Sequence, residues 1–174
     1  ATTTGYMLFK RFNRSISKTS PGVASQNRPS IIFRLADFYL IYAEVANEVN
    51  PSDSRVLTYL NLVRERAGLP KVEILNPGIV GNKELQRAAI QRERQIELAT
   101  EGQRYFDVRR WMIAPQTESK TMHGIEITRA TDGTKTWKEF DVRTHVWRPA
   151  MYFFPIPYNE TVKSKDLLQN PYYN

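Results

Sequence analysis

The chain has 174 residues, of which 41% are hydrophobic and 11% aromatic, a composition typical of a globular domain rather than a disordered one. It contains no cysteine, which excludes disulfides, thiolate catalysis and cysteine-ligated metal centres. No apolar run approaches the roughly 18 residues that a membrane-spanning helix needs.

The net charge of +7 at pH 7 is compatible with a nucleic-acid partner, but its distribution argues against one. The first 34 residues hold six basic side chains and no acidic one: Lys10, Arg11, Arg14, Lys18, Arg28 and Arg34. The rest of the chain is almost neutral and carries no recognisable nucleic-acid-binding motif. We therefore expect no nucleic-acid partner.

Alternating residues at Gly5–Phe12 predict a strand, and the polar segment after it predicts a loop that ends at Pro29. Residues 1–30 thus form a lead-in to the first helix. From Ile31 the apolar residues recur every three or four positions, which predicts an amphipathic helix that ends at about Asn47–Asn50.

A second helix follows, capped by Ser52 or Asp53 and stopped at Gly68 and Pro70. The two helices predict an antiparallel hairpin similar to one tetratricopeptide unit. A single such unit cannot bury its apolar face alone, so neighbouring elements are implied.

Asn82 is positioned to cap a third helix over Lys83–Thr100, and Arg104–Met112 predicts a further helical segment. This completes a helical scaffold over residues 31–113. Residues 114–174 are predicted to be an irregular segment and a C-terminal tail. Within 115–150, Asp132–Gly133 is expected to form the turn between two short strands, and after Pro149 the chain is expected to be extended.

The stretch Glu93–Trp111 combines acidic and basic residues at helical spacing. Three glutamates four residues apart share one helical face, and arginines are interleaved with them. We interpret the stretch as a structural ion-pair network, made of Glu93, Glu97, Glu101, Arg104, Asp107, Arg109 and Arg110, with Arg94 as a further source of positive charge.

Catalytic and metal interpretations of this stretch are weaker. A glycosidase needs a carboxyl with a raised pKa, whereas neighbouring guanidinium groups lower carboxyl pKa values. A di-metal helix bundle needs Glu-x-x-His pairs, and the two histidines, His123 and His145, are not so spaced. No nucleophile elbow, phosphate-binding loop or dinucleotide fingerprint is present. We predict no catalytic residue, no metal site and no cofactor.

Five segments of the chain resemble, in order, the C-terminal part of the SusD/RagB family. They are Arg34–Glu48, Tyr59–Pro70, Glu93–Trp111, Tyr152–Glu160 and Leu168–Tyr173. Two positions depart from the family pattern, with Thr100 in place of an aromatic residue and Tyr172 in place of a glycine. Since Ala1 reads as an internal residue, we expect the chain to be the C-terminal piece of a longer protein.

The resemblance implies a mainly helical fold with tetratricopeptide-like hairpins and an irregular lobe that contains short strands. It also implies a non-catalytic glycan-binding protein on the outer-membrane surface, anchored by a lipidated cysteine outside this chain. Its partners would be a SusC-type TonB-dependent transporter, an oligosaccharide or polysaccharide, and the missing N-terminal part of the same protein. The hairpin would supply scaffold and part of the transporter-facing surface.

Sugar recognition uses flat aromatic rings and planar polar groups. Trp137, Trp147 and His145 lie in the segment predicted to be irregular and are the candidate ligand-binding residues, although the main site is expected upstream of this chain. The alternative, which we favour because long loops need anchors, is that both tryptophans hold this segment onto the helices. Two other functions stay open: a tetratricopeptide-type adaptor for proteins or peptides without a glycan ligand, and a glycoside hydrolase.

Overall fold

The computed structural model describes residues 4–6, 8, 10, 30–164 and 166–173. The chain divides into two compact units, Asn27–Asp107 and a second unit formed by Val108–Asn174 with Ala1–Gln26. The strand predicted for Gly5–Phe12 and the loop after it lie largely outside the described residues.

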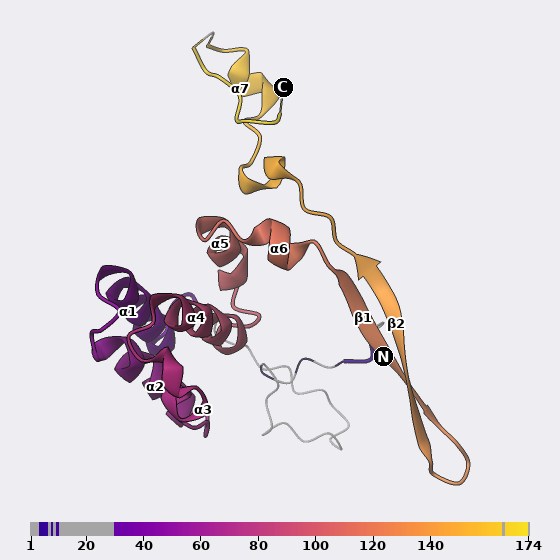
Figure 1. Cartoon of the computed structure of the whole chain (residues 1–174). Coiled ribbons are helices and arrows are strands. Elements are labelled where there is room, and N and C mark those ends of the chain that lie inside the picture. Colours follow the sequence, from indigo (N-terminus) through magenta and orange to yellow (C-terminus); the bar gives the residue numbers. More distant parts are fainter. Residues whose placement is uncertain (1–3, 7, 9, 11–29, 165, 174) are drawn as a thin grey trace. The chain divides into compact units, whose positions relative to one another are not determined.

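The first unit is helical (Figure 1). Its elements in chain order are α1 (Leu35–Val49), α2 (Arg55–Arg66), α3 (Val72–Leu75), the 3-10 turn η1 (Pro77–Ile79) and α4 (Lys83–Glu97). Helix α1 packs along α2, and α4 packs against both of them. The predicted helical hairpin is therefore confirmed, and the third helix completes its core.

The core of this unit consists of small and branched apolar side chains. Leu40 on α1, Leu60 on α2 and Ile90 on α4 are all fully buried. Ala43 on α1 is buried as well and lets the neighbouring helices approach closely. Burial of such side chains supplies the main favourable free energy of folding.

The helix ends follow local chemistry that the sequence predicts. The side chain of Asn82 accepts a hydrogen bond from the backbone N–H of Leu85 at 3.1 Å and caps α4. Gly68 ends α2 with a φ of +76°, a conformation that glycine adopts without strain. Helix α4 ends at Glu97, three residues before the predicted end, and Thr100 already has a φ of +67°.

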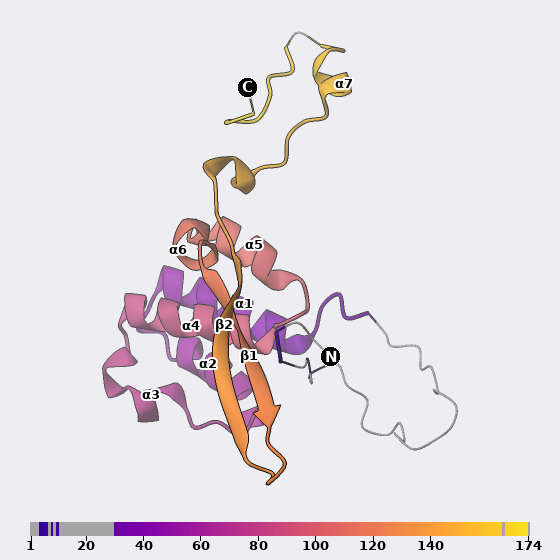
Figure 2. The same ribbon diagram turned by 90° about the vertical axis from the view of Figure 1, so that its right-hand side faces the viewer.

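Helix α5 (Gln103–Arg110) begins in the helical unit, and its last residues belong to the second unit. The second unit continues with α6 (Ala114–Glu118), β1 (Thr121–Arg129), β2 (Lys135–Thr144), η2 (Pro149–Tyr152) and α7 (Tyr158–Thr161). The two strands pair antiparallel from Thr121↔Thr144 to Arg129↔Lys135 and lie side by side in Figure 2. Gly133, with a φ of +88°, lies in the predicted turn between them.

The expectation of an extended chain after Pro149 was wrong at its start, since Pro149–Tyr152 form the 3-10 turn η2. Residues 115–150 contain the two expected strands and are more regular than expected between them and α5. They form a short helix and a hairpin whose strands have nine and ten residues, longer than the mean strand of about five or six. Most side chains of both strands are exposed. The hairpin consequently lacks the apolar alternation by which a strand is normally recognised. The fold class, mainly helical with a small two-stranded sheet, is confirmed.

The C-terminal segment packs on itself through backbone carbonyls. The hydroxyl of Tyr173 donates to the carbonyl oxygens of Ala150 and Phe153, both at 2.9 Å. The amide of Gln169 exchanges two hydrogen bonds with the backbone of Ile156, at 2.7 and 2.8 Å. Among the described residues, no helix combines the length and the apolar character that crossing a membrane requires.

Candidate functional site

Helix α4 carries a buried arginine that joins two carboxylates distant in sequence. The Arg94 guanidinium donates from Nη1 to Asp37 Oδ1 at 2.9 Å, and from Nε and Nη2 to Asp107 at 2.9 and 3.1 Å. All three side chains are at most 4% exposed. The forked contact with Asp107 is the planar geometry that a guanidinium offers to a carboxylate. Arg94 therefore fastens α4 to the start of α1 and to α5 within the helical unit.

The three glutamates of the charged stretch contact arginines from elsewhere in the helical unit. Glu93 pairs with Arg64 of α2 at 2.9 Å. Glu97 pairs with Arg34, which precedes α1, and with Arg66 of α2. Arg34 also pairs with Glu101 at 2.7 Å. The acids on α4 thus connect this helix to the first two helices.

Burial and hydrogen bonding have opposite effects on the pKa of Arg34. Burial lowers its pKa, but hydrogen bonds to Glu101 and Glu97 outweigh this effect, and the pKa lies above its ordinary value. Its Nη2 also donates to the backbone carbonyl oxygen of Glu97 at 2.6 Å. The guanidinium is therefore held at the C-terminal end of α4, where a positive charge is favoured by the helix dipole.

The remaining arginines of the predicted network lie on or near α5. Arg109 donates from Nε to the carbonyl oxygen of Met151 at 3.2 Å, and its guanidinium lies 4.8 Å from the centroid of the Trp147 ring. The Arg110 guanidinium lies 4.6 Å from the centroid of the Trp111 ring. Arg104 is half-buried on α5.

The network also includes residues outside the charged stretch Glu93–Trp111, namely Arg34, Asp37, Arg64 and Arg66. All four lie in the first two family-like segments, so their position within those motifs was the available signal. Sequence distance hid the pairing, because Arg34 and Glu97 are 63 residues apart. The described residues contain no cluster of three His, Asp or Glu side chains that could hold a metal ion.

A cleft of about 520 Å³ lies between α2, α3, η1 and α4. Its lining is mainly apolar and includes Leu69, Val72, Leu75, Ile79, Leu85 and Ile96. Arg64, Arg92 and Glu93 are the charged side chains at this cleft, and none of its lining residues is aromatic. A cleft without a flat ring offers no stacking surface for a sugar.

The structure separates Trp137 from the other two candidate ligand-binding residues. Trp137 lies on β2 opposite Ile127 and is 60% exposed. His145 follows the far end of β2, and its backbone N–H donates to the carbonyl oxygen of Lys120 at 2.9 Å. At about 3.3 Å per residue, these two positions are roughly 26 Å apart along the strand. Trp137 and His145 therefore do not contact one small ligand together.

Trp147 is held by its neighbours. Its ring meets that of Tyr152 edge-on at a centroid distance of 5.1 Å, and the Arg109 guanidinium covers its face. Its backbone N–H donates to the Ser119 hydroxyl at 2.9 Å. The ring is thus engaged in packing, whereas the ring of Trp137 presents a large accessible area.

Comparison with known proteins places the chain in one family. The sequence model of the SusD family matches residues 1–173. The SusD-like protein P2 of Formosa agariphila is 31% identical over 144 residues, which are 80% of this chain and 25% of that protein. The SusD-like protein P25 of the same species is 44% identical over 89 residues, which are 51% of this chain and 16% of that protein.

Comparison with solved protein structures points to the same family. A crystal structure of a SusD-like protein from Bacteroides fragilis matches with a TM-score of 0.70 and 35% sequence identity. The match covers 83% of this chain and 26% of that one. The chain thus spans about a quarter or less of the length of these relatives.

Proposed function

The chain belongs to the SusD family, and on this basis we propose that its protein binds an oligosaccharide at the outer-membrane surface and passes it to a SusC-type TonB-dependent transporter. The observation that carries the proposal is the family match over residues 1–173. A lipid anchor would be provided by a cysteine outside these residues, and a further N-terminal part would complete the protein. Residues 1–30, 31–113 and 114–174 would act as lead-in, helical scaffold and C-terminal lobe.

The mechanism in this proposal is binding and release without chemistry. Glu93, Glu97 and Asp107 each contact at least one guanidinium, so their carboxylates take part in ion pairs between helices. These contacts support a structural role for the network, in which the ion pairs fix the positions of α1, α2, α4 and α5 relative to one another. The surface of this scaffold is then available for contacts with ligand and transporter.

Among the candidate ligand-binding residues, Trp137 is the strongest. Its ring is 60% exposed on β2, and an exposed indole face can stack on the C–H face of a sugar ring. Trp147 would support the base of the hairpin, because its ring packs against Tyr152 and Arg109. His145 is exposed and would donate to sugar hydroxyls near that base.

Affinity gel electrophoresis tests the proposal. Native gels that contain amylopectin, xyloglucan or mucin should retard the protein in at least one case relative to a gel without polysaccharide. The Trp137→Ala variant should lose part of the retardation, and the control Tyr158→Ala, which removes another exposed aromatic ring, should not. Release of reducing sugar from the same polysaccharides would instead support a hydrolase.

A second candidate is a tetratricopeptide-type adaptor that binds a protein or peptide. The packed pair α1–α2, with an apolar groove beside it lined by Phe38, Tyr42 and Tyr59, favours it. Absence of retardation in every polysaccharide gel, together with capture of a defined peptide partner, would support this candidate over the glycan-binding one.

A further inference from the structure

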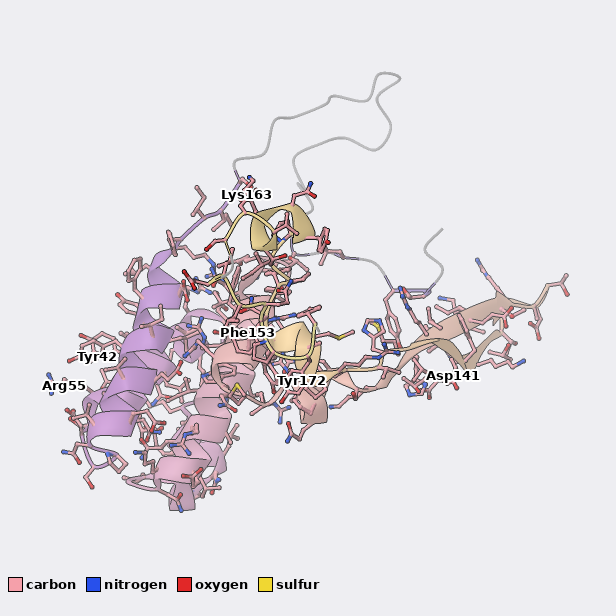
Figure 3. The ribbon with its side chains drawn as sticks, turned by 90° about the horizontal axis from the view of Figure 1, so that it is seen from above. Tyr42, Arg55, Asp141, Phe153, Lys163 and Tyr172 are labelled. Carbon is pink, nitrogen blue, oxygen red and sulfur yellow. The ribbon has the colours of Figure 1, made fainter. Side chains whose placement is uncertain are left out.

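One face of the β1–β2 hairpin combines an aromatic ring with charged residues on both sides of it. Directly opposite residues of an antiparallel pair share a face of the sheet, and so do alternate residues of one strand. Figure 3 shows side chains on both sides of the hairpin ribbon and labels Asp141 on β2. The face that we call the Trp137 face carries the cross-strand pairs Arg129–Lys135, Ile127–Trp137, Ile125–Glu139 and His123–Asp141.

The centre of the Trp137 face is an accessible apolar patch. The Trp137 side chain is 60% exposed, and Ile127 opposite it is 48% exposed. Within the described parts of the chain, no aromatic ring or guanidinium packs on the Trp137 ring. The ring of Trp147, in contrast, is covered by the guanidinium of Arg109. The indole of Trp137 can therefore offer its flat face to a ligand.

Arg129 and Lys135 lie next to Trp137 on the side of the hairpin turn. Two residues separate each strand position from the next one on the same face, which is about 7 Å along the strand. Long side chains reach over such a distance to their diagonal neighbours. A ligand that stacks on Trp137 is consequently within reach of both positive charges.

These two positive charges have no partner among the residues that the structure describes. Both side chains are exposed, and Arg129 lies directly opposite Lys135. The acidic residue of the turn, Asp132, accepts a hydrogen bond from the backbone N–H of Thr134 at 2.9 Å instead. Like charges directly opposite each other destabilise a strand pair. An anion held between Arg129 and Lys135 would remove this repulsion.

The acidic residues of the Trp137 face lie on the other side of the ring and contact a histidine. Asp141 Oδ1 lies 2.9 Å from His123 Nδ1, and Glu139 Oε1 lies 3.5 Å from the same nitrogen. Carboxylates repel an anion, so a negatively charged group of a ligand would be directed away from Glu139. It would point towards the turn, where Arg129 and Lys135 lie.

We propose that the Trp137 face binds an anionic oligosaccharide, with a sugar ring stacked on Trp137 and a carboxylate or sulfate group held by Arg129 and Lys135. The planar guanidinium of Arg129 can donate two parallel hydrogen bonds to either group, and the Lys135 ammonium adds a second positive charge. The inference rests on the proposed function and adds to it the charge of the ligand. A neutral oligosaccharide would leave both cations without a partner.

Binding of matched oligosaccharide pairs to the full-length protein tests the inference. One pair is prepared from κ-carrageenan and its desulfated form, and the other from polygalacturonate and its methyl ester. Isothermal titration calorimetry is performed in about 0.15 M NaCl, where long-range attraction is screened. The anionic member of at least one pair should bind about tenfold more tightly than its neutral counterpart. The pair that shows this preference distinguishes a sulfate ligand from a carboxylate ligand.

Substitutions on the hairpin locate the contact. Lys135→Gln should weaken binding of the anionic oligosaccharide about three- to tenfold. The matched control Lys138→Gln removes the same charge from the opposite face of β2 and should change the affinity less than about twofold. Trp137→Ala should weaken binding about three- to tenfold, because it removes the stacking surface. An unchanged affinity in Trp137→Ala would overturn the inference.

Two further results would overturn it. Equal affinity for the anionic and neutral members of both pairs would do so and would leave the proposed glycan binding intact. Equal losses in Lys135→Gln and Lys138→Gln would indicate diffuse attraction between a basic protein and an anionic chain, not a site on the Trp137 face. No binding of any oligosaccharide, in calorimetry or in the polysaccharide gels, would contradict both the inference and the proposed function.

Discussion

Arg94 and Asp37 form an ion pair in the interior of the helical unit, although 57 residues separate them in sequence. Their side chains are 3% and 4% exposed. The same guanidinium also donates two hydrogen bonds to the Asp107 carboxylate. One arginine on α4 thereby contacts two buried acidic residues that lie on α1 and α5.

Replacement of Arg94 by Met should destabilise the protein strongly. The substitution removes the Arg94 guanidinium from two buried carboxylates, and breaking a buried pair in this way costs about 3–5 kcal/mol. The free energy of unfolding, measured by urea titration with circular dichroism at 222 nm, should fall accordingly. The matched control Arg92→Met removes an exposed arginine two positions away and should change the value by only about 0.5 kcal/mol. Equal losses in the two variants would contradict the structural role of Arg94.

A surface ion pair should make part of the stability depend on pH. A hydrogen bond from Arg87, assisted by Lys83, lowers the pKa of Glu48 from 4.5 to about 2. Because the folded-state pKa is depressed, this stabilisation is present above about pH 4.5 and is lost as the pH falls towards 2. Glu48 is 41% exposed, so the contribution is screened and below about 1 kcal/mol.

Urea midpoints measured at pH 7, 4 and 3 check this prediction. The wild-type midpoint should fall more between pH 7 and pH 3 than that of Glu48→Gln, since the variant lacks the titrating carboxyl. The difference should shrink in 1 M NaCl, where exposed charges are screened. Parallel pH profiles in low salt would show that the Glu48–Arg87 pair does not contribute.

Thr100 should be a position where glycine stabilises. Its φ of +67° is unfavourable for a β-branched residue and easy for glycine. Thr100→Gly should therefore raise the free energy of unfolding by about 0.5–1 kcal/mol. The same replacement in the middle of α2, Thr58→Gly, should lower it by about 0.5 kcal/mol, because glycine disfavours helix. Thermal unfolding of both variants measures these changes in the free energy of unfolding. Changes of the same sign in the two variants would rule out backbone strain at Thr100.

Tyr172 has a comparable conformation, with a φ of +71°, at the position where the family usually has a glycine. Tyr172→Gly should relieve the backbone there and increase protection of the C-terminal segment. Amide hydrogen exchange at Tyr173 and Gln169 should become slower by a factor of about 2–5. Faster exchange in the variant would contradict this prediction. It would mean that the Tyr172 ring, which is 70% exposed, stabilises the C-terminal segment more than the strained backbone destabilises it.

Local sequence signals predicted much of the helical unit. The periodicity from Leu35 and the capping side chain of Asn82 located α1 and α4, since both depend on neighbours within a few residues. Asp132–Gly133 located the hairpin turn for the same reason. The strands on either side were not predicted at their full length, because exposed residues such as Trp137 and Ile127 alternate with other exposed residues rather than with buried ones.

The site was less predictable than the fold. The acidic residues of the charged stretch were identified, but their partners Arg34, just before α1, and Arg64, on α2, are distant in sequence. Their pairing depends on tertiary packing. Arg109, which was assigned to the ion-pair network, also has its guanidinium 4.8 Å from the centroid of the Trp147 ring. Sequence alone could not separate these roles, since an arginine that pairs with a carboxylate and one that stacks on a ring have the same local spacing.

Retention and recovery of an oligosaccharide test the central claim most directly. The full-length protein, immobilised on beads, is incubated with oligosaccharides prepared from whichever polysaccharide retards it, and the eluted chains are sized by mass spectrometry. The account predicts that the oligosaccharides are retained and recovered at their original length. Recovery of shortened chains, or no retention of any oligosaccharide in the set, would contradict it.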